Sequence, residues 1–219
     1  MARKKEQITR KEDILNAAQK LFSQNGFEKT TIEQIANKAG IAKGSVYIDF
    51  SSKQEILHAI IERFGKQRIQ EIEEKIEQLS PPYLNAIKEI ILEDILKVFK
   101  MANTQVDTHI RLMYTRYQVN QKFKYLIEKR KEILAKLLKN SAENGEMSEY
   151  ADYKRISDML YLMLVAFYPP YAFKYSVSNN QDKGIDDIKK LMASDAVYAL
   201  EIFFDGIKYN KTERKNNEA

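Results

Sequence analysis

The chain has 219 residues, 44% of them hydrophobic, which is enough for one or two domains with a buried core. Its 36 Lys and Arg exceed its 31 Asp and Glu, and the net charge of +5 favours a polyanionic partner without requiring one. The absence of cysteine excludes disulfides, thiolate chemistry and cysteine-based zinc sites. The sequence shows no signal peptide and no apolar run long enough to cross a bilayer, so we expect a soluble, cytoplasmic protein without membrane contact.

The basic excess lies at the N-terminal end of the chain. Residues 1–55 hold ten Lys and Arg against seven Asp and Glu, whereas the rest of the chain is nearly neutral. Contact with a nucleic acid is therefore expected near the N-terminus. Arg3, Lys4 and Lys5 leave two possibilities open, a basic arm that reaches a DNA groove or a solvated chain end.

Three helix starts are predicted by capping boxes, in which a Ser or Thr side chain caps the helix and a Glu three residues later bonds back to the cap. The three pairs are Thr9–Glu12, Thr30–Glu33 and Ser52–Glu55. Between the second and third pairs, Gly40 stands where the chain must turn sharply before a short helix over 43–48. Two short helices joined by a tight turn are typical of a helix-turn-helix that binds DNA.

The short helix over 43–48 is expected to turn one side to the core and the other to solvent. Val46 faces the core in this arrangement, and the residues left mostly outward are Lys43, Gly44, Ser45 and Tyr47. A basic face with small and hydroxyl-bearing side chains suits a DNA groove.

The remaining sequence predicts helices and no sustained strand pattern. A fourth helix is expected from Ser52 to the Ser80-Pro81-Pro82 stop, and later helices at about 83–101, 104–117, 119–142, 150–174 and 184–209. We therefore predict an all-α protein with a three-helix helix-turn-helix domain in residues 1–55 and a larger helical domain in residues 56–219.

The last two long helices are apolar on more than one side. Residues 159–167 are apolar around most of the helix, and residues 188–207 carry two apolar faces, although burial in one core needs only one. A homodimer formed through these two helices explains the pattern, because a two-fold pair places two DNA-binding helices one DNA turn apart. The alternative is that both helices are enclosed in a larger core.

The segment from about Thr9 to Phe64 resembles the N-terminal domain of the TetR family of bacterial transcriptional regulators. The family has a characteristic pattern at this place, and it is present here with its spacing intact. The pattern begins with Gly and an apolar residue, continues with Lys-Gly-Ser, a second apolar residue and Tyr, and ends with Phe and Ser-Lys. Its members here are Gly40, Ile41, Lys43, Gly44, Ser45, Val46, Tyr47, Phe50, Ser52 and Lys53. The resemblance covers roughly a quarter of the chain and implies a DNA-binding domain followed by a helical domain that binds an effector and dimerises.

The resemblance also implies roles for single residues. Lys43 and Tyr47 would contact base edges or the DNA backbone, and Gly44 would allow close approach. Thr31, Ser45 and Lys53 would contact phosphates. The alternative makes Tyr47 a core anchor and leaves the lysines solvated.

Asp49 departs from the pattern, because many relatives have Tyr or His there and an acid repels phosphates. It would either cap or pair with Lys53, or alter how the helix lies on DNA.

An effector pocket is expected among aromatic, Met and His residues in the middle of the C-terminal domain, where they suit an apolar or flat ligand. Ordinary core and interface packing is the alternative for each residue. Seven residues form this set: His109, Met113, Tyr114, Tyr117, Phe167, Tyr168 and Tyr171.

We expect no catalytic residues and no metal site, because the sequence has no catalytic motif. Its two histidines, His58 and His109, fall on different predicted helices without a nucleophile motif nearby. We therefore predict a homodimeric, ligand-responsive repressor that binds a palindromic operator and needs no cofactor. Residues 64–70, with Gly65 as a flexible point, would transmit the effector signal. Two alternatives are a DNA-bound interaction protein without a small-molecule effector and an enzyme with an incidental helix-turn-helix.

Overall fold

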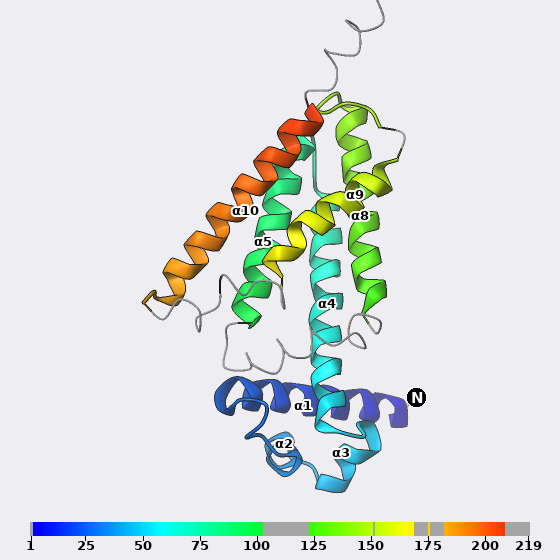
Figure 1. Ribbon diagram of the computed structural model, residues 1–219. Helices are drawn as coiled ribbons and strands as arrows, with labels where there is room; N and C mark the ends of the chain where they lie inside the picture. Colours follow the sequence, from blue (N-terminus) through cyan, green and yellow to red (C-terminus); the bar gives the residue numbers. More distant parts are fainter. Residues whose placement is uncertain (1, 103–122, 151, 169–174, 176–181, 209–219) are drawn as a thin grey trace, which may run out of the picture. The chain divides into compact units, whose positions relative to one another are not determined.

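The computed structural model describes residues 2–102, 123–150, 152–168, 175 and 182–208, and regular structure within these ranges is helical throughout (Figure 1). The all-α prediction is thus confirmed. In chain order the elements are α1 (Ala2–Asn25), α2 (Ile32–Ala39), α3 (Lys43–Asp49), α4 (Lys53–Glu77), α5 (Tyr83–Ala102), α8 (Lys124–Glu143), α9 (Tyr153–Leu164), the 3-10 turn η1 (Val165–Phe167) and α10 (Ile185–Lys208).

The chain divides into two compact units within α4. Among the described residues, the first unit holds 2–67 and 102, and the second holds 68–101 and those within 123–208. The division falls between Gln67 and Arg68, later than the boundary at residues 55 and 56 that the sequence suggested. The first turns of α4 bury Ile56 and Leu57 completely, which gives this part of the helix to the core of the first unit.

The start of α1 was predicted wrongly. The helix begins at Ala2, so the backbone of Arg3, Lys4 and Lys5 is helical rather than an extended arm. Thr9 and Glu12 have the capping spacing but lie inside the helix. Glu12 instead accepts a charge-assisted hydrogen bond from Arg63 on α4, with Nη1 and Oε2 2.6 Å apart.

The capping box of α2 lies one residue later than predicted. Thr31 is the cap, its Oγ1 accepts from the Gln34 amide at 3.1 Å, and the Gln34 side chain accepts from the Thr31 amide at 2.9 Å. Thr30 is buried instead, and its hydroxyl donates to the Gly26 carbonyl at 2.8 Å. Of the third expected box the cap is present, because the Glu55 amide donates to Ser52 Oγ at 3.1 Å. The Glu55 carboxylate accepts from the amide of Ser51 at 2.6 Å, one residue before the expected partner.

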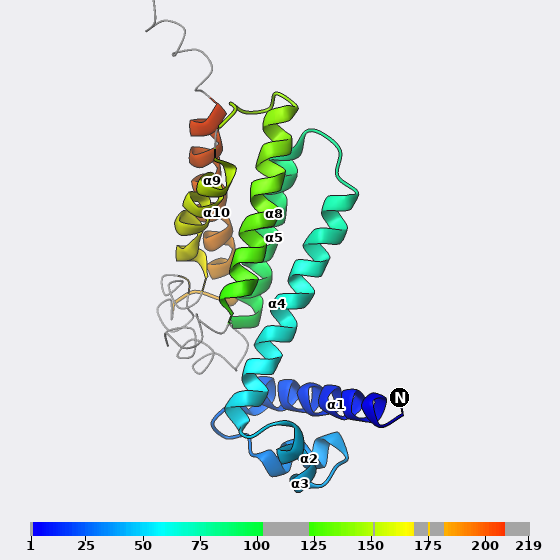
Figure 2. The same cartoon turned by 90° about the vertical axis from the view of Figure 1, so that its right-hand side faces the viewer.

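The second unit packs α5, α8, α9 and α10 around one apolar core (Figure 2). Ile95, Leu138, Leu160, Ile188 and Phe204 are fully buried or nearly so, and α9 packs against both α8 and α10. The Glu146 carboxylate accepts from the first amides of α5, those of Tyr83 at 2.7 Å and Leu84 at 2.8 Å. This carboxylate stabilises a helix end whose amides have no partner within the helix.

The later helices partly match their predicted ranges. The expected helices over 83–101 and 184–209 are confirmed by α5 and α10, whereas the one over 104–117 lies outside the described residues. The helix expected over 150–174 ends at Leu164, and the 3-10 turn carries the chain to Phe167. Tyr168 is extended, with φ −110° and ψ 146°, because the residue before a proline is disfavoured in the helical region. No helix in the described part of the chain is long and apolar enough to cross a membrane.

Candidate nucleic-acid interface and effector unit

The turn between α2 and α3 depends on Gly40. Its φ of 70° and ψ of 27° lie in the left-handed region, where a residue with a Cβ is strained. The Ile41 amide then donates to the Ala36 carbonyl at 3.0 Å, which closes the end of α2. Only three residues separate α2 from α3, so the two helices form a helix-turn-helix.

α3 turns its core residue inward and most of the predicted contact residues outward. Val46 is fully buried, whereas Lys43 and Gly44 are exposed and Tyr47 retains 50% of its accessible surface. Ser45 is half-buried. Tyr47 is thus not enclosed in the core, and its ring is available to a partner.

Thr31 is exposed beside this surface and already accepts a hydrogen bond as the cap of α2. Its hydroxyl proton remains a donor, so capping is compatible with the predicted phosphate contact. The contacts of Thr31, Lys43, Gly44, Ser45 and Tyr47 with DNA stay predictions. Ile48 was missed by the sequence reasoning although 70% of its surface is exposed, and the signal that identifies it is its position two residues after the buried Val46.

Lys53 performs a structural task that the sequence did not predict. Its ammonium donates to the carbonyl oxygens of Phe27 at 2.7 Å, Glu28 at 3.2 Å and Thr30 at 2.8 Å. The same ammonium lies 4.4 Å from the centroid of the Phe27 ring. Lys53 therefore holds the loop between α1 and α2 against the start of α4. Its phosphate contact stays a prediction, and all three ammonium donors have acceptors within the protein.

Asp49 pairs with Arg10 rather than with Lys53. Arg10 Nε lies 2.6 Å from Asp49 Oδ2, and Gln7 donates to the other carboxylate oxygen at 3.4 Å. The hydrogen bond from Arg10 lowers the pKa of the Asp49 carboxyl, and the same bond raises the pKa of Arg10. The Asp49 side chain has no accessible surface, so the negative charge at the end of α3 is enclosed and neutralised.

Two of the seven predicted pocket residues are described by the structure. Phe167 is buried and stacks on Tyr175 with ring centroids 5.8 Å apart. Tyr168 donates from its hydroxyl to Asp94 Oδ2 at 2.8 Å, and burial raises the pKa of its phenol. The other five lie outside the described residues: His109, Met113, Tyr114, Tyr117 and Tyr171.

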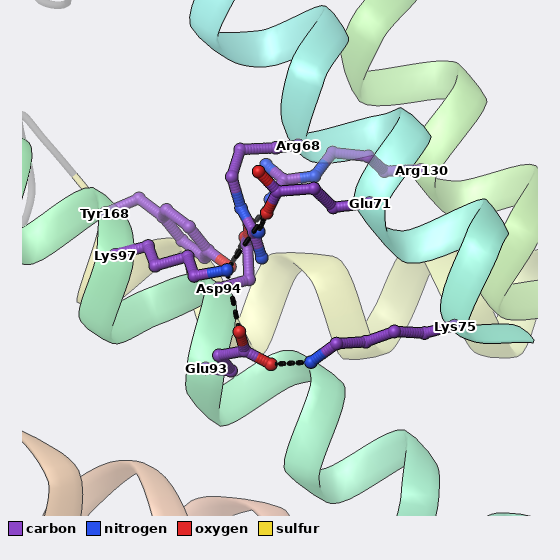
Figure 3. A network of polar contacts seen from close by, with 8 residues as sticks. All are labelled: Arg68, Glu71, Lys75, Glu93, Asp94, Lys97, Arg130 and Tyr168. Atoms are coloured by element: carbon purple, nitrogen blue, oxygen red, sulfur yellow. Dashed lines mark hydrogen bonds and ion pairs between the residues drawn. The ribbon is translucent and has the colours of Figure 1, made fainter.

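Tyr168 belongs to a polar network between helices of the second unit (Figure 3). Asp94 of α5 is buried and accepts from Arg68 Nε at 3.1 Å, from Arg130 of α8 and from Tyr168. Arg68 also pairs with Glu71 one turn further along α4. One buried carboxylate therefore joins α4, α5, α8 and the segment after η1.

The network extends along the surface between α4 and α5. Lys97 of α5 lies 2.9 Å from Glu71 and 2.7 Å from Glu93, and Glu93 also pairs with Lys75 of α4. Hydrogen bonds from Lys75 and then Lys97 lower the pKa of Glu93 to about 2. The C-terminal half of α4 is thus tied to α5 by charged groups at successive turns.

Arg63 ties the N-terminal half of α4 to α1. Arg63 contacts Glu12 as described above, and its guanidinium donates to Asn16 Oδ1 at 3.0 Å and Gln19 Oε1 at 2.8 Å. These three acceptors all lie on α1. In the described ranges, no group of three or more His, Cys, Asp or Glu side chains is placed to hold a metal ion.

Comparisons with known proteins agree with this architecture. Residues 14–60 match the family model described as "Bacterial regulatory proteins, tetR family". The fatty acid metabolism regulator protein of Bacillus subtilis is 26% identical over 152 residues, which cover 68% of this chain and 76% of that protein.

Solved structures share the fold over most of the chain. FadR from Bacillus subtilis, solved in complex with stearoyl-CoA, is 23% identical with a TM-score of 0.60, over 90% of this chain and 98% of that one. SmeT, the repressor of the Stenotrophomonas maltophilia multidrug efflux pump SmeDEF, is 20% identical with a TM-score of 0.62, over 92% and 91%. SmeT has also been solved in complex with triclosan.

A helix-turn-helix of this kind is typical of DNA-binding regulators, and the family model that matches it describes bacterial regulatory proteins. The relatives named above are regulators rather than enzymes. Residues 14–60 thus form a DNA-binding domain of the TetR family of bacterial transcriptional regulators.

Proposed function

We propose that the protein is a homodimeric repressor that binds a palindromic operator in the cytoplasm, is released by a small apolar molecule and has no catalytic activity. The observation that carries the proposal is the exposed face of α3. Lys43, Gly44 and Tyr47 lie on this face, whereas Val46 is buried in the core. This face supplies a cation for phosphates, a place without a side chain for close approach, and a ring with a polar tip for base edges.

Exposed apolar side chains on α9 and α10 support the dimer. Met159 and Leu162 of α9 retain 50% and 59% of their surface, and Tyr198 and Ile202 of α10 retain 67% and 58%. The spacing of each pair, three residues on α9 and four on α10, places its members on one side of the helix. A second copy packed on α9 and α10 would bury both pairs and bring two α3 helices to the successive half-sites of a palindrome.

The effector is proposed to be a molecule with a long apolar body, for which an acyl chain is the first candidate. FadR of Bacillus subtilis has been solved with stearoyl-CoA and SmeT with triclosan, and each ligand has an apolar part, a long acyl chain in the first and chlorinated aromatic rings in the second. In this chain, the aromatic residues Phe167, Tyr168 and Tyr175 lie where η1 ends the helical part of α9. The seven residues named from the sequence remain the proposed lining of the site.

The two ends of α4 provide a path for the signal. Arg63 fixes the N-terminal half to α1, and Arg68 begins the network that fixes the C-terminal half to α5 and α8. An effector that rearranges Tyr168 would act on Asp94 and through it on Arg68. The protein would have an operator-binding state and a released state. To move the ratio of released to operator-binding protein from 1:99 to 99:1, the effector must bind the released state more tightly by about 5.5 kcal/mol.

Binding of the purified protein to DNA from upstream of its own gene tests the proposal. Fluorescence anisotropy over a salt series, with a scrambled duplex as competitor, should show selective binding that weakens steeply as salt rises. Lys43→Ala should weaken binding, whereas Lys136→Ala, the same charge change at an exposed position of α8, should not.

Stearoyl-CoA, stearate and triclosan are then added to the preformed complex. Release by one of them supports the effector proposal. Selective binding that none of them relieves would favour the second possibility, a DNA-bound protein whose helical unit recruits another protein. Equal binding to operator and scrambled duplex would contradict operator recognition.

A further inference from the structure

The most exposed large apolar side chain in the described part of the chain lies on the DNA-binding helix. Ile48 of α3 retains 70% of its accessible surface, more than any residue of the exposed patches on α9 and α10. The core does not require it, because α3 and the residue that follows already contribute the buried Val46 and Phe50. Most of the Ile48 side chain is therefore available for contact with a partner outside the chain.

The residues on either side of Ile48 do not obstruct its approach to a partner. Tyr47 precedes it and is half-exposed. Asp49 follows it, and its side chain has no accessible surface and is paired with Arg10. The negative charge that would repel a DNA strand is thus neutralised beside Ile48, which permits the side chain to approach a groove.

The major groove offers one apolar group to such a side chain. Each base pair presents hydrogen-bond donors and acceptors there, and only thymine adds a methyl group, at C5. An isoleucine side chain makes no hydrogen bond, so it gains from contact with that methyl group and leaves the amino group of cytosine without an acceptor. The chemistry of Ile48 therefore discriminates by the presence of a methyl group.

We propose that Ile48 is a specificity-determining residue that selects a thymine, or the equivalent 5-methylcytosine, at one position in each half-site. The inference rests on operator binding by α3, as stated under the proposed function, and adds a residue that the sequence pattern did not assign. Tyr47 and Lys43 make polar and phosphate contacts on the same helix, and Ile48 contributes the methyl contact.

The test removes the methyl group without changing base pairing. Duplexes that bind the wild-type protein are first selected from a random pool, and each thymine is then replaced singly by uracil. At one symmetric pair of positions, the replacement should lower the affinity of the protein for the duplex about fourfold for each half-site. This value follows from the free energy of burying one methyl group. Replacing that T·A pair by C·G should weaken binding, and 5-methylcytosine in place of cytosine should recover part of the loss.

The matched variants are Ile48→Ala and Ile8→Ala, since Ile8 is an exposed isoleucine of α1 in the same unit. Ile48→Ala should bind thymine and uracil duplexes equally at the critical position and remain sensitive to changes elsewhere. Ile8→Ala should keep the wild-type profile. Thermal unfolding of both variants checks that the unit is folded.

Two results would overturn the inference. One is a wild-type protein for which no thymine methyl group matters, and the other is an Ile48→Ala variant with unchanged methyl dependence. Selection that enriches no duplex would overturn operator binding as well, so failure of the proposed function is distinguishable from failure of the Ile48 contact alone.

Discussion

Arg63 and Arg68 lie little more than one helical turn apart on α4, yet they bind different partners. The acceptors of Arg63 are on α1, whereas Arg68 pairs with Asp94 on α5 and with Glu71 on α4 itself. The short segment between them contains Gly65, the residue with the least resistance to bending in a helix. Any signal that passes along α4 must cross this segment.

Gly65→Ala should therefore reduce the response to effector while leaving both binding equilibria intact. Alanine stabilises a helix interior by roughly 0.5–1 kcal/mol over glycine and stiffens the segment. Operator affinity by anisotropy and effector affinity by calorimetry should stay within about twofold, and the effector concentration needed for release should rise. Gly184→Ala, at the residue before α10, where an added Cβ meets only Asp187 Oδ2 at 3.6 Å, is the control. Unchanged release by Gly65→Ala would exclude this role.

The Arg10–Asp49 pair should influence DNA binding through charge. Arg10→Ala leaves the Asp49 carboxylate uncompensated near the phosphates, so operator binding should weaken, most clearly at low salt. Asp49→Asn in the same chain removes that charge and should restore most of the affinity. Anisotropy of the two single variants and the double variant measures the coupling, with Lys20→Ala as a control for loss of a cation from α1. A double variant as weak as Arg10→Ala would show that the pair acts only by positioning α3.

Lys53→Ala should destabilise the first unit. The carbonyl oxygens of Phe27, Glu28 and Thr30 would lose a charged donor, and hydrogen bonds to charged groups contribute about 1.5–3 kcal/mol. Urea unfolding monitored by circular dichroism gives the change, and Lys38→Ala, at an exposed position of α2, is the comparison. If unfolding were unaffected and only DNA affinity fell, Lys53 would be a phosphate contact rather than a structural residue.

Asp94→Ala should be among the most damaging single changes in the second unit. It leaves the buried guanidinium of Arg68 without its α5 partner, and breaking a buried ion pair from one side costs about 3–5 kcal/mol. The combined change Asp94→Leu with Arg68→Met removes both charges and should recover a large part of the stability. Denaturant midpoints of the three proteins test this, and a double variant no better than Asp94→Ala would contradict it.

Glu93 should make the second unit sensitive to acid. Its pKa is about 2 in the folded protein against 4.5 for a free glutamate side chain, so its ion pairs stabilise the fold above pH 4.5. The contribution is lost as the pH falls from 4.5 towards 2. Glu93→Gln should flatten the fall of unfolding free energy in that window, and Glu89→Gln, an exposed carboxylate of the same helix, should not. Equal pH profiles for wild type and Glu93→Gln would refute the assignment.

The first unit was predicted well because its signals are local. Gly40, Val46 and the Ser52 cap each specify a turn, a core position or a helix start within a few residues. The errors were also local. Thr30 and Thr31 both have a hydroxyl at the start of α2, and only burial of the first decides which one caps the helix. Thr9 and Glu12 have capping spacing, but helix formation continues to Ala2 without a breaking residue.

The polar network was not predictable from pattern. Asp94 is 26 residues from Arg68, 36 from Arg130 and 74 from Tyr168, and no spacing rule connects positions that far apart. On a single helix Asp94 resembles any other acid of a charged face, and only the packing of α4, α5 and α8 shows that it is buried. Ile48 was also missed. It stands between the core residues Val46 and Phe50, and an isoleucine in such a place is ordinarily expected in the core.

In the proposed dimer, the exposed apolar side chains of α9 and α10 make repression depend on the number of chains in the cell. While dimers are scarce, their concentration rises with the square of chain concentration, so operator occupancy rises equally steeply. The controlled gene would then respond steeply to the dosage of the gene that encodes the repressor. Dilution of the repressor during cell growth would relieve repression, as the effector does.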